Sequence, residues 1–363
     1  MSENEGSDGT VASNRKDFSA NVIEQIGKLR LVLFALLFVS LSVLAPVFIS
    51  KGLGGDFHVG YGFLSLRTVV CLLGLLVVYF CCDGLRLFYV LRSMGYRIPL
   101  VGLAKLVFVN IFFSNITPMA TGGGFAQIWY LRRFGVPLGT ATAATTLRTF
   151  LATVCIFGVS PFLLLFLHPF STSLGGGILS LGFAFLGIVY LFLFCLALLK
   201  RNWMIFVLHR GLNLLCRTKV IDRARAVSWR SKAVKEIVRF SRDIRRCSRG
   251  GADILLSVVC TAVFLMALFS FPFFLLRGTG YPVPYLLSVG LLILTTFIMY
   301  FSPTPGGAGF AEGLFGLFFL SSIPSSELVS VIVIWRFLTI YLGMGIGFLF
   351  TLTDLFGRRR CGA

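Results

Sequence analysis

Two short stretches of this chain combine helix-breaking residues with backbone groups that could bind an anion. The first is "FFSNITPMATGGGFAQ" at 112–127, and the second is "YFSPTPGGAGFAE" at 300–312. Both read Phe-Ser, then Thr-Pro, a glycine cluster, Gly-Phe-Ala and finally Gln or Glu. Glycine and proline breaks leave backbone N–H groups free, and a helix that begins after the break directs its positive end at the gap. Each stretch could therefore bind a phosphate.

An arginine follows each stretch about twenty residues later, within an apolar segment: Arg148 in "TTLRTFL" and Arg336 in "IWRFLT". A planar guanidinium group matches two phosphate oxygens at once. Alternatively, the arginines pair with Glu312 or with backbone carbonyls and only hold the fold together; the residues favour neither reading. The predicted substrate-binding set is Asn115, Thr117, Pro118, Gly122, Gly123, Gly124, Gln127 and Arg148 in the first half, and Pro303, Thr304, Pro305, Gly306, Gly307, Glu312 and Arg336 in the second.

The composition indicates a membrane protein. Of the 363 residues 57% are hydrophobic and only 13% are charged, whereas a soluble domain has about 25% charged residues. Long apolar runs recur along the chain, and a helix needs about 20 such residues to cross a bilayer. The first run begins behind a polar tail and has full span length, so we expect an uncleaved helix and no signal peptide. Six full spans are predicted, at about 31–50, 65–85, 138–165, 175–199, 253–276 and 327–354.

The positions of the charges predict the topology. Fifteen of the 33 Lys and Arg lie in 200–249, and cationic segments stay in the cytoplasm. This rule places both termini in the cytoplasm of a plasma-membrane protein. The apolar runs 99–131 and 282–321 then each begin and end on one side of the membrane. Each is predicted to form a re-entrant hairpin, the first entering from inside and the second from outside.

The predicted fold class is therefore an all-α polytopic membrane protein with about six full spans plus two re-entrant helical hairpins in an inverted repeat. Inverted repeats with broken helices are typical of secondary transporters. Irregular backbone at membrane depth is tolerated only inside protein or against a watery cavity. The predicted organisation is a polar tail at 1–29, one membrane domain at 30–355 with repeats at about 65–167 and 253–354 and a basic segment at 200–250, and a basic tail at 356–363.

The same motifs carry a resemblance to a known family. "TPMATGGGFAQ" and "SPTPGGAGFAE", with the later Arg148 and Arg336, resemble the transmembrane region of lysylphosphatidylglycerol synthases, which also forms the wider family of flippase-like integral membrane proteins. The resemblance covers about 20–355. It implies a flippase-like membrane domain without the soluble aminoacyl-transfer domain of the synthases. Gln127 stands where many relatives carry an acid, so the two hairpins need not act alike.

No enzyme class is indicated by the remaining residues. The three histidines are scattered, "CDGLR" at 82–86 lacks the further aspartates of a CDP-alcohol phosphotransferase, and "TGGGF" lacks the Gly-Lys-Ser/Thr of a P-loop. We expect no catalytic residue, no metal, no cofactor and no nucleic-acid partner. Three acids, Asp83, Asp253 and Asp354, are expected at helix ends, where they are solvated or act as caps.

The predicted function is a transporter or flippase-like protein for an anionic membrane lipid, either a phospholipid or a polyprenyl-phosphate carrier, bound at the hairpin tips. The alternative belongs to another class: a non-transporting membrane partner that anchors a lipid-modifying or glycosyl-transferring enzyme. In that case the basic segment 200–249 is the docking surface.

Overall fold

The computed structural model describes residues 65–117, 120–166, 174–217, 223–247, 250–319 and 323–357, together with Ser40 and Lys51. The chain divides into two units, Met1–Phe48 and Ile49–Ala363, and all helices discussed below belong to the second. The predicted tail 1–29, nearly all of the predicted span 31–50 and most of the tail 356–363 lie outside the described residues.

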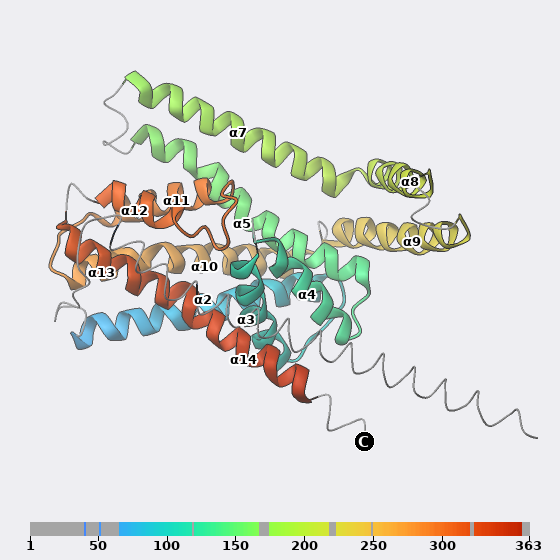
Figure 1. Cartoon of the computed structure of the whole chain (residues 1–363), viewed down its shortest axis with the longest axis horizontal. Coiled ribbons are helices and arrows are strands. Elements are labelled where there is room, and N and C mark those ends of the chain that lie inside the picture. Colours follow the sequence, from blue (N-terminus) through green and yellow to red (C-terminus); the bar gives the residue numbers. More distant parts are fainter. Residues whose placement is uncertain are drawn as a thin grey trace, which may run out of the picture. The chain divides into compact units, whose positions relative to one another are not determined.

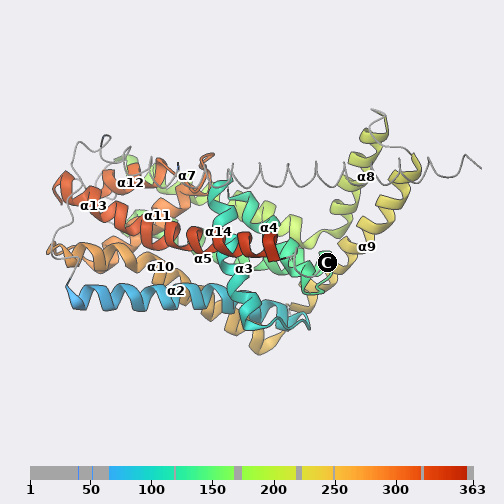
Figure 2. The same cartoon turned by 60° about the horizontal axis from the view of Figure 1, so that its bottom comes forward.

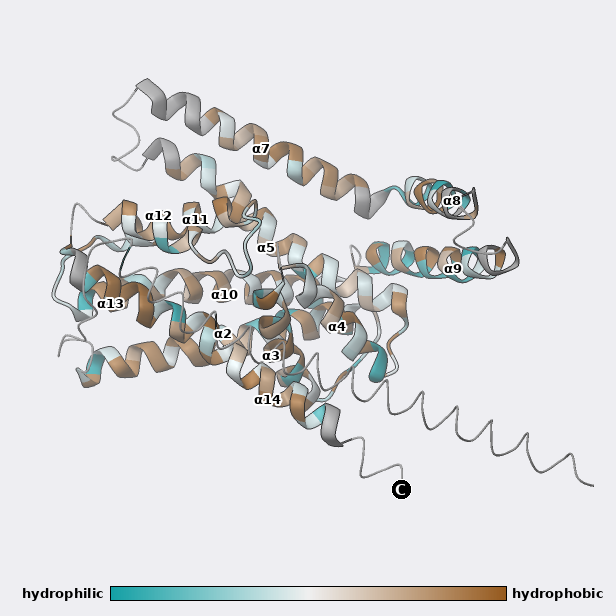
Figure 3. Cartoon of the chain, viewed as in Figure 1, coloured by the Kyte–Doolittle hydropathy of each residue, from teal (hydrophilic) through white to brown (hydrophobic). Residues whose placement is uncertain are grey.

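The regular elements of the described part are helices (Figure 1). Figure 3 shows that α2, α7 and α10 are mostly hydrophobic, whereas α9 is largely hydrophilic. In chain order the elements are α2 Leu66–Ser93, α3 Leu100–Ile116, α4 Thr121–Arg133, α5 Leu138–Phe166, α7 Leu174–Leu199, α8 Arg201–Arg217, α9 Arg223–Cys247, α10 Gly251–Gly278, α11 Tyr285–Met299, α12 Phe310–Phe319, α13 Ser325–Arg336, a π-helical turn Phe337–Tyr341, and α14 Leu342–Gly357.

Four described helical segments are long and apolar enough to cross a membrane, or five if α7 and α8, which meet at a sharp bend, count as one. The four are Leu66–Ser93, Leu138–Leu163, Gly251–Gly278 and Glu327–Asp354. Each overlaps a predicted span, so the protein is an integral membrane protein with an all-helical membrane domain. The total of six spans stays a prediction. The predicted span 65–85 is eight residues shorter at its end than helix α2, which continues to Ser93.

Both predicted hairpin runs are broken where glycine and proline gather. The first run divides into α3 and α4 around 117–120, and the second divides into α11 and α12 around 300–309. Lys105 near the start of α3 and Arg133 at the end of α4 both reach the carboxylate of Asp354, at 3.3 and 3.4 Å. The start of α3 and the end of α4 therefore both lie near Asp354, so the chain reverses direction between these two helices. Its depth in a membrane stays a prediction.

Helices from the two predicted repeats pack against each other. Helix α2 lies antiparallel to α10, since Arg92 and Arg86 near the end of α2 bond Asp253 and Ser257 near the start of α10 (Figures 1 and 2). Helix α14 packs on α3, and α5 packs on α11. The last helix of each predicted repeat thus packs against the first short helix of the other.

The buried apolar residues form two clusters. One contains Tyr79 on α2 with residues of α10, α11 and α13, and the other contains Leu87 on α2 with residues of α3, α4, α5 and α9. Helix α2 passes from the first cluster to the second. The stretch between these two residues carries buried charges.

Candidate functional site

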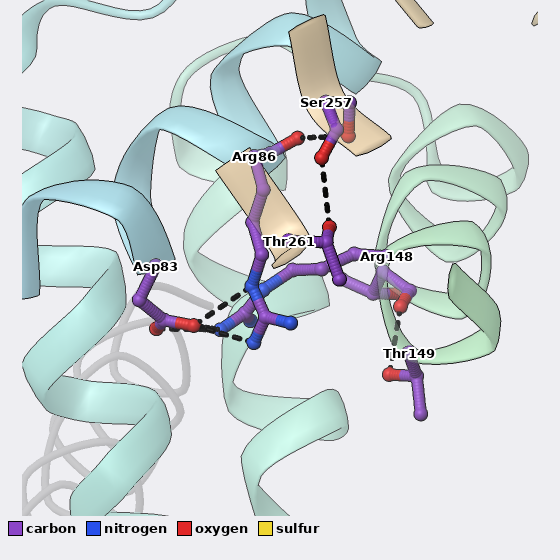
Figure 4. A network of polar contacts seen from close by, with 7 residues as sticks. Asp83, Arg86, Arg148, Thr149, Ser257 and Thr261 are labelled. Atoms are coloured by element: carbon purple, nitrogen blue, oxygen red, sulfur yellow. Dashed lines mark hydrogen bonds and ion pairs between the residues drawn. The ribbon is translucent and has the colours of Figure 1, made fainter. Parts of the chain in front are cut away.

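The first buried charge cluster joins α2 to α5 (Figure 4). The carboxylate of Asp83 accepts hydrogen bonds from Nε of Arg86 at 2.9 Å and from Nη2 of Arg148 at 2.6 Å. Asp83 is 3% exposed, Arg86 7% and Arg148 5%. The guanidinium group of Arg86 also lies over the ring of Phe264 on α10, 4.0 Å from its centre. We call Asp83, Arg86 and Arg148 site one.

Site one has more positive charge than its acid can neutralise. Arginine stays protonated in proteins, so two guanidinium groups and one carboxylate leave one formal positive charge in excess. Two buried nitrogens, Nη1 of Arg86 and Nε of Arg148, have no hydrogen-bond partner among the described residues. Buried charges are normally paired and buried polar atoms are normally bonded. Site one therefore combines an excess positive charge with two buried donors that have no partner among the described residues.

The second buried charge cluster lies in the loop 300–309 and the helices on either side of it. Nε of Arg336 on α13 is 2.7 Å from the carboxylate of Glu312 on α12. Its Nη1 and Nη2 donate to the carbonyls of Gly306 and Gly307, both at 3.3 Å. Arg336 is 2% exposed and Glu312 is 4% exposed. This cluster, which we call site two, is formally neutral.

Backbone geometry explains the glycines of site two. Gly306, Gly307 and Gly309 have φ values of 59°, 66° and 85°, in the left-handed region that costs other L-residues about 1–2 kcal/mol. The turn directs two carbonyls at Arg336, while the N–H of Gly309 donates to Glu312 at 2.7 Å. Glu312 thus caps the start of α12. The π-helical turn Phe337–Tyr341 begins directly after Arg336.

The first motif is built differently. The side chain of Thr117 accepts from the N–H of Gly122 at 2.8 Å, closing the break between α3 and α4. A Cβ on Gly122 or Gly123 would overlap α3, whereas one on Gly124 would meet no atom within 4 Å. Two of the three glycines therefore allow α4 to pack closely on α3. Pro118 lies outside the described residues.

The two motifs meet in space. A Cβ added to Gly306 would lie 2.7 Å from the side-chain oxygen of Asn115 on α3. Tyr300, at the start of the second motif, accepts a long hydrogen bond of 3.4 Å from Thr153 on α5. Residues of the second motif therefore contact α3 and α5 of the first predicted repeat. Within the second motif, the hydroxyls of Ser302 and Thr304 are 2.8 Å apart, while Pro303 is exposed and Pro305 partly buried.

Gln127 occupies the place in the first motif that Glu312 holds in the second. It is 2% exposed, and its Nε2 has no hydrogen-bond partner among the described residues. The structure gives no bond between Gln127 and Arg148. The motifs therefore match in sequence but not in the contacts that their final residues make.

One expectation about site one was wrong. Asp83 is neither solvated nor at a helix end, because α2 continues for ten residues beyond it. Its partner Arg86, which is also buried, was not among the predicted site residues. A signal was present in the sequence: an acid and a base three residues apart lie on one face of a helix. Asp253 and Asp354 do lie near helix ends, where both form ion pairs.

Comparison with known proteins decides the family. Residues 25–347 match the profile described as "Lysylphosphatidylglycerol synthase TM region". The chain belongs to this family. A "UPF0104 membrane protein" of Archaeoglobus fulgidus is 24% identical over 266 residues, which are 73% of this chain and 79% of that protein.

Site one and site two both fall inside the residues that match this family. Among the described residues, no group of three or more His, Cys, Asp or Glu could hold a metal ion. The arginines of the two sites offer positive charge and hydrogen-bond donation by guanidinium groups.

Proposed function

We propose that this protein transfers an anionic lipid, a phospholipid or a polyprenyl-phosphate carrier, across the membrane and that site one binds its phosphate. The excess charge of site one carries the proposal. A buried charge without a partner costs several kcal/mol (about 3–5 when a pair is broken), and a phosphate would supply the missing negative charge. The free nitrogens of Arg86 and Arg148 are the donors that would bind it.

The packing of the repeats supports transport rather than simple binding. Helices α2 and α10 are antiparallel, and α5 and α14 cross to the opposite repeat. In transporters built from inverted repeats, substrate sites lie near the bilayer midplane where the repeats meet. Site one consists of residues of the first predicted repeat, and Arg86 also contacts Phe264 and Ser257 on α10 of the second. The Asn115–Gly306 contact joins the two repeats directly. In this proposal site two has a structural role: it holds the loop 300–309 against Asn115 of α3.

The central experiment replaces Arg86 by Met. The change removes the excess charge and leaves Asp83 paired with Arg148, so we expect an unchanged or higher melting temperature, as replacement of buried ionic groups by apolar ones often gives. Transport of labelled phospholipid or isoprenoid phosphate between leaflets of proteoliposomes should be lost. Arg67→Met is the matched control, because Arg67 is exposed on the same helix.

Two results would count against the proposal. In one, the wild-type protein moves no labelled lipid faster than empty vesicles do. In the other, Arg86→Met is stable and transports as fast as Arg67→Met. A loss of stability in Arg86→Met would instead show that the second arginine is needed structurally and that no phosphate completes the cluster.

The proposed membrane placement has its own test. Arg97 and Phe134, both exposed, flank the α3–α4 pair, so Arg97→Cys and Phe134→Cys should react with an impermeant thiol reagent from the same, cytoplasmic side. Reactive native cysteines are replaced first. Cys247 can stay: it is 2% exposed, and burial raises the pKa of its thiol, so little reactive thiolate forms at neutral pH. Labelling from opposite sides would make 99–131 a plain span.

The second candidate is a non-transporting partner of a lipid-modifying or glycosyl-transferring enzyme. The observation in its favour is the exposed surface of α8 and α9, which includes Trp203 and Trp229 beside many cations. Gentle purification from native membranes separates the two candidates. A soluble enzyme that co-purifies with this protein in an equal molar amount supports the partner role. Its absence, together with transport activity, supports the first proposal.

A further inference from the structure

Helices α8 and α9 lie side by side (Figure 2). Two adjoining open hollows are lined by residues at the start of α8 and on α9. The larger, about 580 Å³, is lined by Arg201 at the start of α8 and by one face of α9; the smaller, about 520 Å³, is lined by residues at the start of α8 and by Arg245. The described lining residues include five cations and no acid. They are Lys200, Arg201, Asn202, Val238, Ser241, Arg242, Arg245 and Arg246.

Ser241 is the second, independent sign of a ligand. It is 7% exposed and lines the larger hollow. Its hydroxyl oxygen is buried and has no hydrogen-bond partner among the described residues. A serine within a helix usually donates to the carbonyl one turn earlier, as Ser270 and Ser160 do here. Ser241 thus brings a buried hydroxyl, without a partner among the described residues, to the wall of the hollow.

Contacts with other helices hold α9 in place beside the hollow. Phe240 and Ile244 are buried in the second apolar cluster. The carboxylate of Asp243 accepts from Thr140 on α5 at 2.6 Å, and Arg246 donates to the carbonyl of Met94 at 3.2 Å. A helix held at several points presents its cations in a preorganised arrangement, which lowers the entropic cost of binding.

We infer that this hollow binds a phosphate group between Arg201, Ser241 and Arg245. Arginine forks and a serine hydroxyl are suited to phosphate oxygens. The start of a helix adds a positive partial charge, and Arg201, the first residue of α8, lines both hollows. Val238 supplies an apolar wall. The phosphate could belong to a lipid headgroup or to a soluble compound, and site one plays no part in this inference.

The experiment uses the full chain purified in a neutral detergent, with Arg86→Met as the background so that site one does not contribute. Binding of dioctanoyl phosphatidylglycerol, dioctanoyl phosphatidylcholine and inorganic pyrophosphate is measured by titration calorimetry. The test variant is Arg201→Gln with Arg245→Gln. The control is Arg230→Gln with Lys232→Gln, which changes the net charge equally at exposed positions outside both hollows.

The test variant should weaken binding roughly tenfold or more, because two charge-assisted hydrogen bonds are lost, while the control should change it by less than about threefold. Ser241→Ala should weaken binding several-fold without lowering the melting temperature. Preference for phosphatidylglycerol over pyrophosphate identifies a lipid headgroup, and the reverse identifies a soluble phosphate. Equal weakening in test and control, or no effect of Ser241→Ala, overturns the inference.

Discussion

Site one and site two are both buried, and both contain an arginine that follows a glycine-rich break, yet they differ in charge. In site two, Arg336 is neutralised by Glu312 and its remaining nitrogens reach two carbonyls. In site one, Arg148 shares a single carboxylate with Arg86. The same sequence pattern has thus produced one formally neutral cluster and one with an excess positive charge, and each contains a buried arginine nitrogen without a hydrogen-bond partner among the described residues. A recurring motif therefore does not imply a recurring function.

The difference traces to the last residue of each motif. Glu312 is an acid at the start of α12, where the helix dipole favours it, and it lies close enough to meet Arg336. Gln127 has no charge to offer Arg148. Asp83 on α2 supplies the acid for Arg148 instead. Because Asp83 also pairs with Arg86 on the same helix, the cluster contains two arginines and one acid.

The largest effect is expected for Asp83→Asn. It leaves two buried arginines beside each other without an acid, so the loss of stability should be at least the roughly 3–5 kcal/mol typical of a broken buried pair. Asp253→Asn is the control, since Asp253 also pairs with an arginine but is partly exposed and should cost about 1 kcal/mol or less. Equal melting temperatures for the two variants would contradict the assigned burial of site one.

Glu312→Gln should be the next most severe change, again with a loss of about 3–5 kcal/mol, because Arg336 keeps its charge without a partner. The double change Glu312→Gln with Arg336→Met should recover much of the melting temperature, since no charge then remains buried. Guanidinium or thermal unfolding of the wild type, of Glu312→Gln, of Arg336→Met alone and of the double variant gives the coupling. Strictly additive losses would mean that the pair does not stabilise the protein.

Gly306→Ala tests the contact between the motifs. The left-handed φ alone should cost about 1–2 kcal/mol, and the new Cβ would press on Asn115. Adding Asn115→Ala should relieve part of the loss. Gly124→Ala, in open space within α4, is the control and should be neutral or stabilising by up to about 1 kcal/mol. If Asn115→Ala restores none of the stability lost in Gly306→Ala, then Gly306 and Asn115 are not in contact.

The smallest effect is expected for Gln127→Leu. Its buried amide nitrogen has no partner among the described residues, so removing the amide should change stability by less than about 1 kcal/mol. The same substitution at the matching position, Glu312→Leu, should be severe. A loss comparable to that of Glu312→Leu would reveal a partner for Gln127 and make the two sites more alike than the structure indicates.

Much of the local structure could be predicted from the sequence. Hydrophobic length located four of the spans to within a few residues at most ends, and glycine and proline located both breaks. The pairing of Arg336 with Glu312 or with hairpin carbonyls was one of two predicted alternatives, and both contacts are present. The partner of Arg148 was missed. Asp83 lies 65 residues away on another helix, and the prediction ended that helix before Arg86.

The sequence by itself determined the class of protein, the places where helices begin and break, and the family, because hydrophobic length, glycine and proline act locally. Only the tertiary structure decided which acid meets which arginine. A helix turns by about 100° per residue, so a small difference in rotation or in the end of α2 would direct Asp83 away from α5. The packing of α2 between α10 and α5 fixes that rotation, and with it the unneutralised charge of site one.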